Sequence, residues 1–147
     1  MKSLFVIKIG GNVIDNDSAL ASFIDDLSTL KGAWILVHGG GKIATDLSTR
    51  LGIETQMIDG RRITDQATLD VVTMVYGGLV NKRIVAALQA KGINALGLTG
   101  ADGDCIRAKK RVNPTTDYGF VGDVERVGVE RILSLIQAGF FPILAPL

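Results

Sequence analysis

The residues best suited to chemistry in this sequence lie at two glycine-rich turns. The first turn is Lys8-Ile9-Gly10-Gly11-Asn12, in which a lysine is followed closely by adjacent glycines. Backbone N–H groups at such a turn can converge on an anion, and a lysine adds a positive charge beside them. The alternative is an edge lysine that happens to precede an ordinary turn. Taken alone, this segment fits a phosphate cradle and a simple turn equally well.

The second turn is His38-Gly39-Gly40-Gly41-Lys42, which comes directly before an amphipathic stretch. Free N–H groups at the start of a helix favour negative charge, so this turn is also suited to an anion. It is not a P-loop, because Ile43 stands where Ser or Thr should bind Mg²⁺. A histidine at the end of a buried strand is more often a packed side chain than a catalyst. We therefore assign no catalytic role to His38.

The same turn loosely fits the dinucleotide-binding fingerprint through Gly39, Gly41 and Ala44. Asp59 follows at a spacing that could let it reach a ribose. The fingerprint normally lies in the first strand-to-helix turn, however, and this is the second such turn. A dinucleotide-binding α/β domain that uses the Gly39-Gly40-Gly41 loop is the alternative function.

A third candidate is the arginine pair in Asp59-Gly60-Arg61-Arg62, just before a residue that can cap a helix. A guanidinium in this position can clamp a carboxylate through two parallel hydrogen bonds, whereas the alternative is a surface ion pair. Side chains alternate along an extended segment. We therefore expect only one of Arg61 and Arg62 to face a pocket.

The elements that must position these residues follow from hydrophobic periodicity and from the glycines that punctuate it. Buried strands are predicted over residues 4–9, 33–37, 93–99 and 140–147. Helices are predicted from a cap at Asp17, after Gly41, from Thr64 or Asp65 with an interruption near Gly77-Gly78, and over 129–138. Hairpins are predicted at Asp59-Gly60 and over 105–127. This alternation favours a three-layer αβα sandwich whose mainly parallel sheet is covered on both faces.

Composition excludes several kinds of partner and site. The chain has 147 residues, a net charge of +1, one cysteine and one histidine, which rules out an internal disulfide and argues against a structural zinc site. Lysines and arginines are scattered, and the run Lys109-Lys110-Arg111 is interpreted as a solvated hairpin tip, so no nucleic-acid partner is expected. There is no signal-peptide pattern and no apolar stretch of membrane-spanning length. We expect a cytoplasmic protein without a membrane contact.

Taken together, these segments resemble the amino-acid kinase family, and within it the acetylglutamate kinase branch. The first glycine turn, the second glycine turn, the segment from Gly60 to Asp65, the segment from Gly78 to Lys82 and the segment from Leu98 to Gly103 recur in the family's order. The resemblance implies that ATP phosphorylates the side-chain carboxylate of an N-acyl-L-glutamate, giving an acyl phosphate in arginine biosynthesis. Whether the acyl group is acetyl, succinyl or the carrier-linked aminoadipate variant is not readable from the sequence.

The resemblance also implies roles for individual residues at the phosphate. Lys8 would contact the transferring phosphoryl group and act as the catalytic residue, while Gly10 and Gly11 would donate amides to phosphate. ATP and Mg²⁺ are the implied cofactors. The metal would be held by phosphate oxygens and water, so no protein metal ligand is named.

Gly40, Gly41 and Arg62 would hold the acylated glutamate, with Arg62 bound to a carboxylate. Arg61 falls where the family varies and receives no role. Family members are about twice as long, so residues 1–147 would form the lobe that binds the acyl amino acid and contacts phosphate. The ATP-binding lobe would lie outside this chain, which ends on Leu147 within an apolar run. Residues 1–147 alone should therefore show no kinase activity.

The stretch from Ala67 to Val85 suggests an assembly. Its apolar residues surround most of a helix, whereas a helix that covers a sheet needs only one apolar stripe. An exposed apolar face of this kind is rarely tolerated in a monomer. Together with the resemblance, this predicts a homodimer joined through this lobe, the alternative being that a further part of the protein covers the face.

Overall fold

The computed structural model describes residues 3–147 and contains a four-stranded parallel sheet in the order β1-β2-β8-β5. The strands are β1 (Leu4–Ile9), β2 (Ala33–His38), β5 (Ala95–Leu98) and β8 (Phe141–Leu144). The predicted strands and the parallel sheet are therefore confirmed. The last strand of the chain lies between β2 and β5, so residues far apart in sequence meet in the middle of the sheet.

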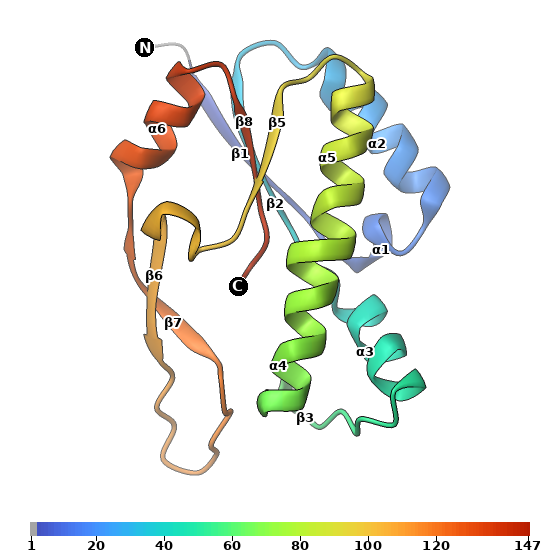
Figure 1. The fold of residues 1–147 in the computed structure, drawn as a ribbon, viewed down its shortest axis with the longest axis vertical. Coiled ribbons are helices and arrows are strands. Elements are labelled where there is room, and N and C mark those ends of the chain that lie inside the picture. The colour runs from blue at the N-terminus through green and yellow to red at the C-terminus, as the bar shows by residue number, and fades with distance from the viewer. Residues whose placement is uncertain (1–2) are drawn as a thin grey trace.

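Helices cover both faces of this sheet, with α2 and α5 on one face and α6 on the other (Figure 1). The helices are α1 (Gly11–Ile14), α2 (Asp17–Thr29), α3 (Gly41–Arg50), α4 (Gln66–Val72), α5 (Asn81–Ala90) and α6 (Val129–Gln137). Side chains of β2 alternate between two cores. Trp34 and Leu36 pack in the larger core with α2 and α5, whereas Ile35 packs with Ile132 of α6.

Two details of the first elements differ from the sequence-based expectation. β1 was expected to be buried, but it is an edge strand, and Leu4, Phe5 and Val6 are 40, 45 and 67% exposed. Hydrophobicity does not distinguish an edge strand from a central one. The cap of α2 is Asn16 rather than Asp17, because the Asn16 side chain accepts a hydrogen bond of 3.0 Å from the backbone N–H of Ala19.

The predicted interruption at Gly77-Gly78 is not a break. The chain stays helical and widens into a π-helical segment, η1 (Thr73–Val80), which joins α4 to α5. The resulting helix, Gln66–Ala90, is long and apolar enough to cross a membrane by length and composition, contrary to expectation. Its buried residues, including Val71, Val75 and Leu88, belong to the larger core, so we interpret it as a helix that packs on the sheet.

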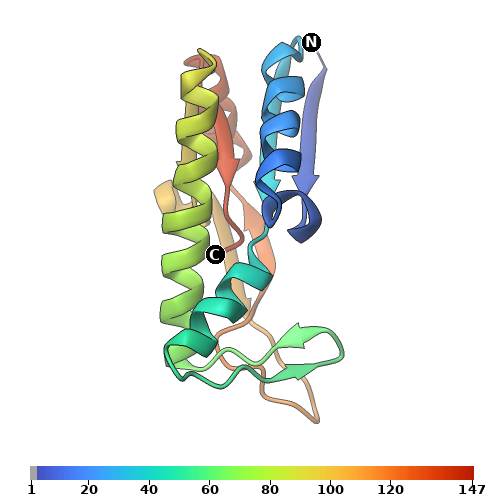
Figure 2. The same ribbon diagram turned by 90° about the vertical axis from the view of Figure 1, so that its right-hand side faces the viewer.

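Two hairpins extend from the end of the sheet at which β2 leads into α3 (Figures 1 and 2). The first hairpin, β3 (Met57–Ile58) and β4 (Arg61–Arg62), turns at Asp59 and Gly60 as predicted. Their φ angles of 50° and 74° match the left-handed backbone that a two-residue hairpin turn requires. The second hairpin consists of β6 (Ile106–Lys110) and β7 (Gly122–Val127). A short 3₁₀ turn, η2 (Asp102–Asp104), leads into it.

Candidate substrate site

The two glycine turns lie side by side. β1 and β2 are parallel neighbours in a register that pairs Lys8 with Val37 and Ile9 with His38, and the N–H of Gly39 donates to the carbonyl of Ile9 at 3.2 Å. Both turns therefore leave the carboxyl ends of adjacent strands, which is where open α/β sheets bind ligands. Lys8 is exposed and shares a sheet face with its partner Val37.

The second turn opens helix α3, which begins at Gly41 with Gly40 as its N-cap. The first N–H groups of a helix have no partner within the helix, so this end of α3 presents free donors. Gly40 is buried against Tyr76 of η1, and a Cβ on Gly40 would lie 2.9 Å from the Tyr76 ring. Only glycine fits this close approach. The π-helical segment thus packs directly on the turn.

Arg62 of β4 reaches back to the same turn. Its Nη2 donates to the carbonyl of Gly41 at 3.0 Å and to Thr45 Oγ1 at 2.8 Å, while Nη1 donates to Thr55 Oγ1 at 3.3 Å. All three acceptors are neutral, and Arg62 has no carboxylate partner within residues 3–147. The guanidinium is therefore positioned beside the turn with its charge uncompensated. Burial raises the pKa of Tyr76, and the positive charge of Arg62 partly opposes this shift.

A buried network of neutral groups supports the turn from below. Asn81 Nδ2 donates to the carbonyl of Ile143 at 2.9 Å and lies 3.0 Å from His38 Nε2, while His38 Nδ1 lies 2.8 Å from the carbonyl of Gly39. His38 and Asn81 are each 1% exposed. The Asn81 amide nitrogen can only donate, so Nε2 of His38 must accept. Nδ1 of His38 therefore carries the ring proton and donates a hydrogen bond to the carbonyl of Gly39. Burial lowers the pKa of His38, which favours this neutral form.

The network depends on a glycine in a neighbouring strand. A Cβ on Gly97 would lie 1.9 Å from Asn81 Oδ1 and 2.8 Å from Lys82 Nζ, so the Asn81 amide occupies the space that a side chain would need. Lys82 Nζ completes the network by donating to Asn81 Oδ1 at 3.1 Å and to the carbonyl of Gly97 at 3.3 Å. Strands β2, β5 and β8 are thereby joined to the helix that packs on the turn.

A cavity of about 1170 Å³ opens between the long helix and the two hairpins. Its apolar wall on the second hairpin includes Phe120, Val121 and Val124. Both Arg61 and Arg62 border it, so the expectation that only one of them faces a pocket is wrong.

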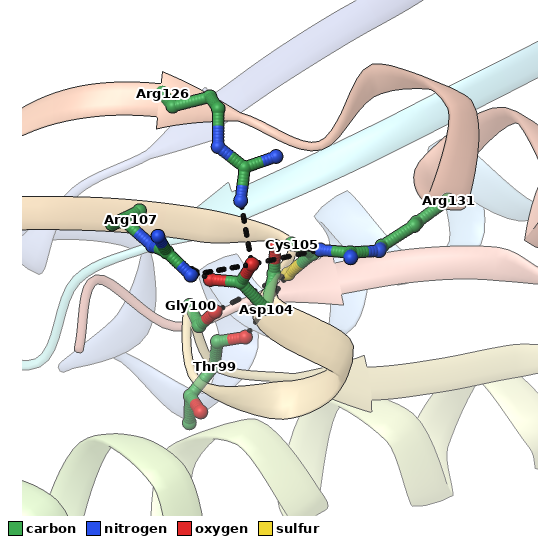
Figure 3. A network of polar contacts seen from close by, with 7 residues as sticks. All are labelled: Thr99, Gly100, Asp104, Cys105, Arg107, Arg126 and Arg131. Atoms are coloured by element: carbon green, nitrogen blue, oxygen red, sulfur yellow. Dashed lines mark hydrogen bonds and ion pairs between the residues drawn. The ribbon is translucent and has the colours of Figure 1, made fainter.

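One carboxylate joins both strands of the second hairpin to α6 (Figure 3). Asp104 accepts hydrogen bonds from Arg107 of β6, Arg126 of β7 and Arg131 of α6. The Asp104–Arg131 hydrogen bond, followed by the other guanidinium contacts, lowers the pKa of Asp104 to about 2. Asp104 has a φ of 52°, in the left-handed region that L-residues rarely adopt. No role was assigned to Asp104 from the sequence, so its role as an anchor was missed.

Residues 3–147 match the model of the amino acid kinase family. The chain belongs to that family. It is 56% identical to an acetylglutamate kinase of Cytophaga hutchinsonii, over 100% of this chain and 56% of that protein. It is also 56% identical to an acetylglutamate kinase of Phocaeicola vulgatus, over 99% of this chain and 57% of that protein. The chain thus spans a little over half the length of these relatives.

A solved structure gives the same answer for the fold. The crystal structure of smu.665 from Streptococcus mutans UA159 has a TM-score of 0.82 and 27% sequence identity, and the match covers 97% of this chain and 58% of that one. The parallel sheet with helices on both faces is therefore an amino acid kinase-like fold. Function, by contrast, must be argued from the site.

Within this amino acid kinase chain, the structure brings Arg62 to Gly41, next to Gly40, whereas Lys8 lies on the neighbouring strand β1 and Gly10 directly follows that strand. Asp59, the candidate ribose ligand, lies instead in the exposed turn between β3 and β4. No group of three or more His, Cys, Asp or Glu residues within 3–147 is arranged to hold a metal ion. We derive no step through a protein-bound metal.

Two residues of the site carried no assignment from sequence. Tyr76 and Asn81 lie in the apolar stretch that was interpreted as a dimer face, yet they contact the second glycine turn and His38. Asn81 lies between the apolar residues Leu79-Val80 and the charged pair Lys82-Arg83, and nothing in the sequence shows that its side chain is buried. Nothing local in the sequence distinguishes Tyr76, because its contact with Gly40 depends on how the helix docks.

Proposed function

We propose that the protein to which this chain belongs uses ATP to phosphorylate the side-chain carboxylate of an N-acyl-L-glutamate. The observation that carries the proposal is Arg62, a guanidinium held beside the Gly40-Gly41 turn by neutral acceptors and without a carboxylate partner among the described residues. A charge held in this way is suited to bind a substrate carboxylate. The acetylglutamate kinases that resemble the chain supply the reaction class.

The chemistry needs few protein groups. A side-chain carboxylate is already ionised at neutral pH, so the acceptor needs no general base. The remaining requirement is to position the two reactants and to stabilise charge at the transferring phosphoryl group. We assign Lys8, Gly10 and Gly11 to that charge, and Gly40, Gly41 and Arg62 to the acyl amino acid. Mg²⁺, bound through phosphate oxygens and water, would neutralise part of the charge of ATP.

The chain is proposed to be the lobe that binds the acyl amino acid, in a cytoplasmic enzyme of arginine biosynthesis. The ATP-binding lobe would be supplied by the remaining length seen in the relatives. Neither a membrane nor a nucleic acid is part of the proposal. The dinucleotide alternative has no support from the position of Asp59, which lies in an exposed hairpin turn.

The test is release of ADP by the full-length protein, measured with and without an N-acyl-L-glutamate. We expect acyl-glutamate-dependent release. Lys8→Ala should lower kcat far more than it changes KM, because the ammonium acts mainly on charge in the transition state. Arg62→Ala should raise KM for the acyl amino acid and leave KM for ATP nearly unchanged. Absence of acyl-glutamate-dependent ADP release would end the proposal.

We also propose a homodimer joined through η1 and the helices on either side of it. Met74 and Leu79 on this helix are 53% and 49% exposed, which leaves apolar groups uncovered on the face away from the core. Pairing of like helices about a two-fold axis is the commonest way to cover such a face. Light scattering after size exclusion should give twice the monomer mass for the full-length protein. A monomer at micromolar concentration would refute the dimer.

A further inference from the structure

The charges around the cavity exceed what a simple acyl-glutamate requires. Four arginines border it, Arg61, Arg62, Arg107 and Arg111, against a single acid, Asp104. Resting on the proposed function, we propose that the N-acyl group of the substrate ends in a carboxylate of its own, as in N-succinyl-L-glutamate. Arg61 is the residue that selects it.

Two of the four arginines are already paired. Arg107 forms an ion pair of 3.0 Å with Asp104, and Arg111 pairs with Asp123 through both Nε and Nη2. Arg62 has only neutral partners, as described above. Arg61 makes neither an ion pair nor a side-chain hydrogen bond within residues 3–147. The cavity therefore has two guanidiniums that are available to substrate.

Asp123 does not compensate Arg61. The pKa of Asp123 is lowered first by its hydrogen bond to Arg111 and to a smaller extent by the charges of Arg111, Arg61 and Lys109. Arg61 thus lies close enough to be felt by this carboxylate but does not bind it. The four residues Arg61, Lys109, Arg111 and Asp123 carry three positive charges and one negative charge. Arg61 and Arg111 border the cavity and Arg111 is the one bound to Asp123, so the charge of Arg61 remains unpaired at this side of the cavity.

A glutamyl substrate can use only one of the two free guanidiniums. Its side-chain carboxylate is the phosphoryl acceptor and belongs at the glycine turns. Its α-carboxylate is then left for Arg62, which is fixed at Gly41. An acetyl group is neutral and would leave Arg61 facing a methyl group, whereas a carboxylate-ended acyl group would form a charge-assisted, two-pronged contact.

The shape of the cavity agrees with a longer acyl group. Arg61 and Arg62 are consecutive in β4, so their side chains leave the strand on opposite sides and can hold two separate carboxylates. The wall formed by Phe120, Val121 and Val124 is apolar and belongs to the same cavity. Methylene groups between the amide and the terminal carboxylate would pack on that wall. Selection of the longer acyl group would thus use the apolar wall for its methylene groups and Arg61 for its terminal carboxylate.

The test compares kcat/KM of the full-length protein for N-succinyl-L-glutamate and N-acetyl-L-glutamate. We expect the succinyl compound to be preferred by at least about 100-fold, because a site built for a charged group discriminates strongly against its absence. Arg61→Leu should remove most of this preference, mainly through KM for the succinyl compound. The matched control is Arg50→Leu at the exposed C-terminal end of α3, a residue that does not border the cavity, and it should leave the preference unchanged.

The outcomes separate this inference from the proposed function. An enzyme that phosphorylates N-acetyl-L-glutamate as well as or better than the succinyl compound would overturn the inference and leave the kinase proposal intact. A succinyl preference that survives in Arg61→Leu would overturn the assignment of Arg61. Phosphorylation of neither compound would overturn both proposals. Comparing the wild-type protein on two substrates does not depend on the folding of any variant.

Discussion

Two polar networks stabilise the elements around the cavity, and they differ in burial and in charge. The network beneath the second glycine turn has a buried, neutral centre, with His38 and Asn81 each 1% exposed, and only Lys82 at its edge carries a charge. The network at the second hairpin is exposed and charged, and the Asp104 side chain that organises it is 36% exposed. The first joins the centre of the sheet to the turn, and the second fastens a hairpin to the outside of the fold.

The difference lies in what each network loses when one partner is removed. A buried donor or acceptor left without a partner bears the full cost of desolvation, since water cannot replace the missing contact. An exposed carboxylate or guanidinium regains water, and its ion pairs are screened by salt. We therefore expect the buried network to control global stability and the exposed one to control the position of the hairpin wall.

The largest expected effect comes from Asn81→Ala. The change removes the donor to His38 Nε2 and the side-chain donor to the carbonyl of Ile143 inside the core, and it opens a small cavity. We expect a loss of about 3 kcal/mol in the free energy of unfolding, measured with urea. Asn94→Ala is the control, since Asn94 also donates to a backbone carbonyl but is exposed, and it should cost under about 1 kcal/mol. Equal losses would remove the contrast between the networks.

Gly97→Ala should have the next largest effect. Its methyl group would enter the space held by Asn81 Oδ1, and the resulting displacement should cost about 2 kcal/mol. Gly78→Ala is the matched control because a Cβ there meets nothing within 4 Å. Alanine in that helix should be neutral or stabilising. Thermal unfolding of the two variants should show a lower Tm for Gly97→Ala than for Gly78→Ala. An equal Tm for the two variants would contradict the prediction.

The pH dependence of stability should report on His38. Burial lowers the pKa of folded His38 below its unfolded value of 6.5, so the unfolded chain binds more protons as pH falls. The free energy of unfolding should decrease as pH drops from about 6.5 toward the folded pKa and should be flat above that window. His38 is the only histidine in the chain, so His38→Gln should flatten the curve. The same slope in both proteins would contradict the prediction.

The smallest effect on stability is expected for Asp104→Asn. The loss should be below that of Asn81→Ala and should shrink between low salt and about 0.5 M salt, where screening is strong. The pKa of Asp104 is about 2 in the folded chain against an ordinary value of 3.8, so its stabilisation is present above 3.8 and is lost as pH falls through about 2. Hydrogen exchange should rise in β6 and β7 rather than throughout the sheet. A loss that does not depend on salt would count against an exposed network.

The sequence by itself determined the local elements and much of the candidate site. Apolar runs placed the strands, and Asp59-Gly60 placed a two-residue hairpin turn because few residues tolerate left-handed backbone. Glycine turns after two early strands predicted where substrate groups gather, since parallel strands bring their carboxyl ends to one edge. Extended geometry left Arg61 and Arg62 as alternatives, and the family resemblance selected Arg62. The predictions of strands and turns succeed because hydrophobic period and turn chemistry are properties of short segments.

Only the tertiary structure decided which segments meet. The insertion of β8 between β2 and β5 places the carbonyl of Ile143 within reach of Asn81, and the docking of η1 places Tyr76 on Gly40. The same docking and the two hairpins set the limits of the cavity that both Arg61 and Arg62 border. Such contacts join residues dozens of positions apart. Their formation depends on packing and strand order, which local periodicity does not encode.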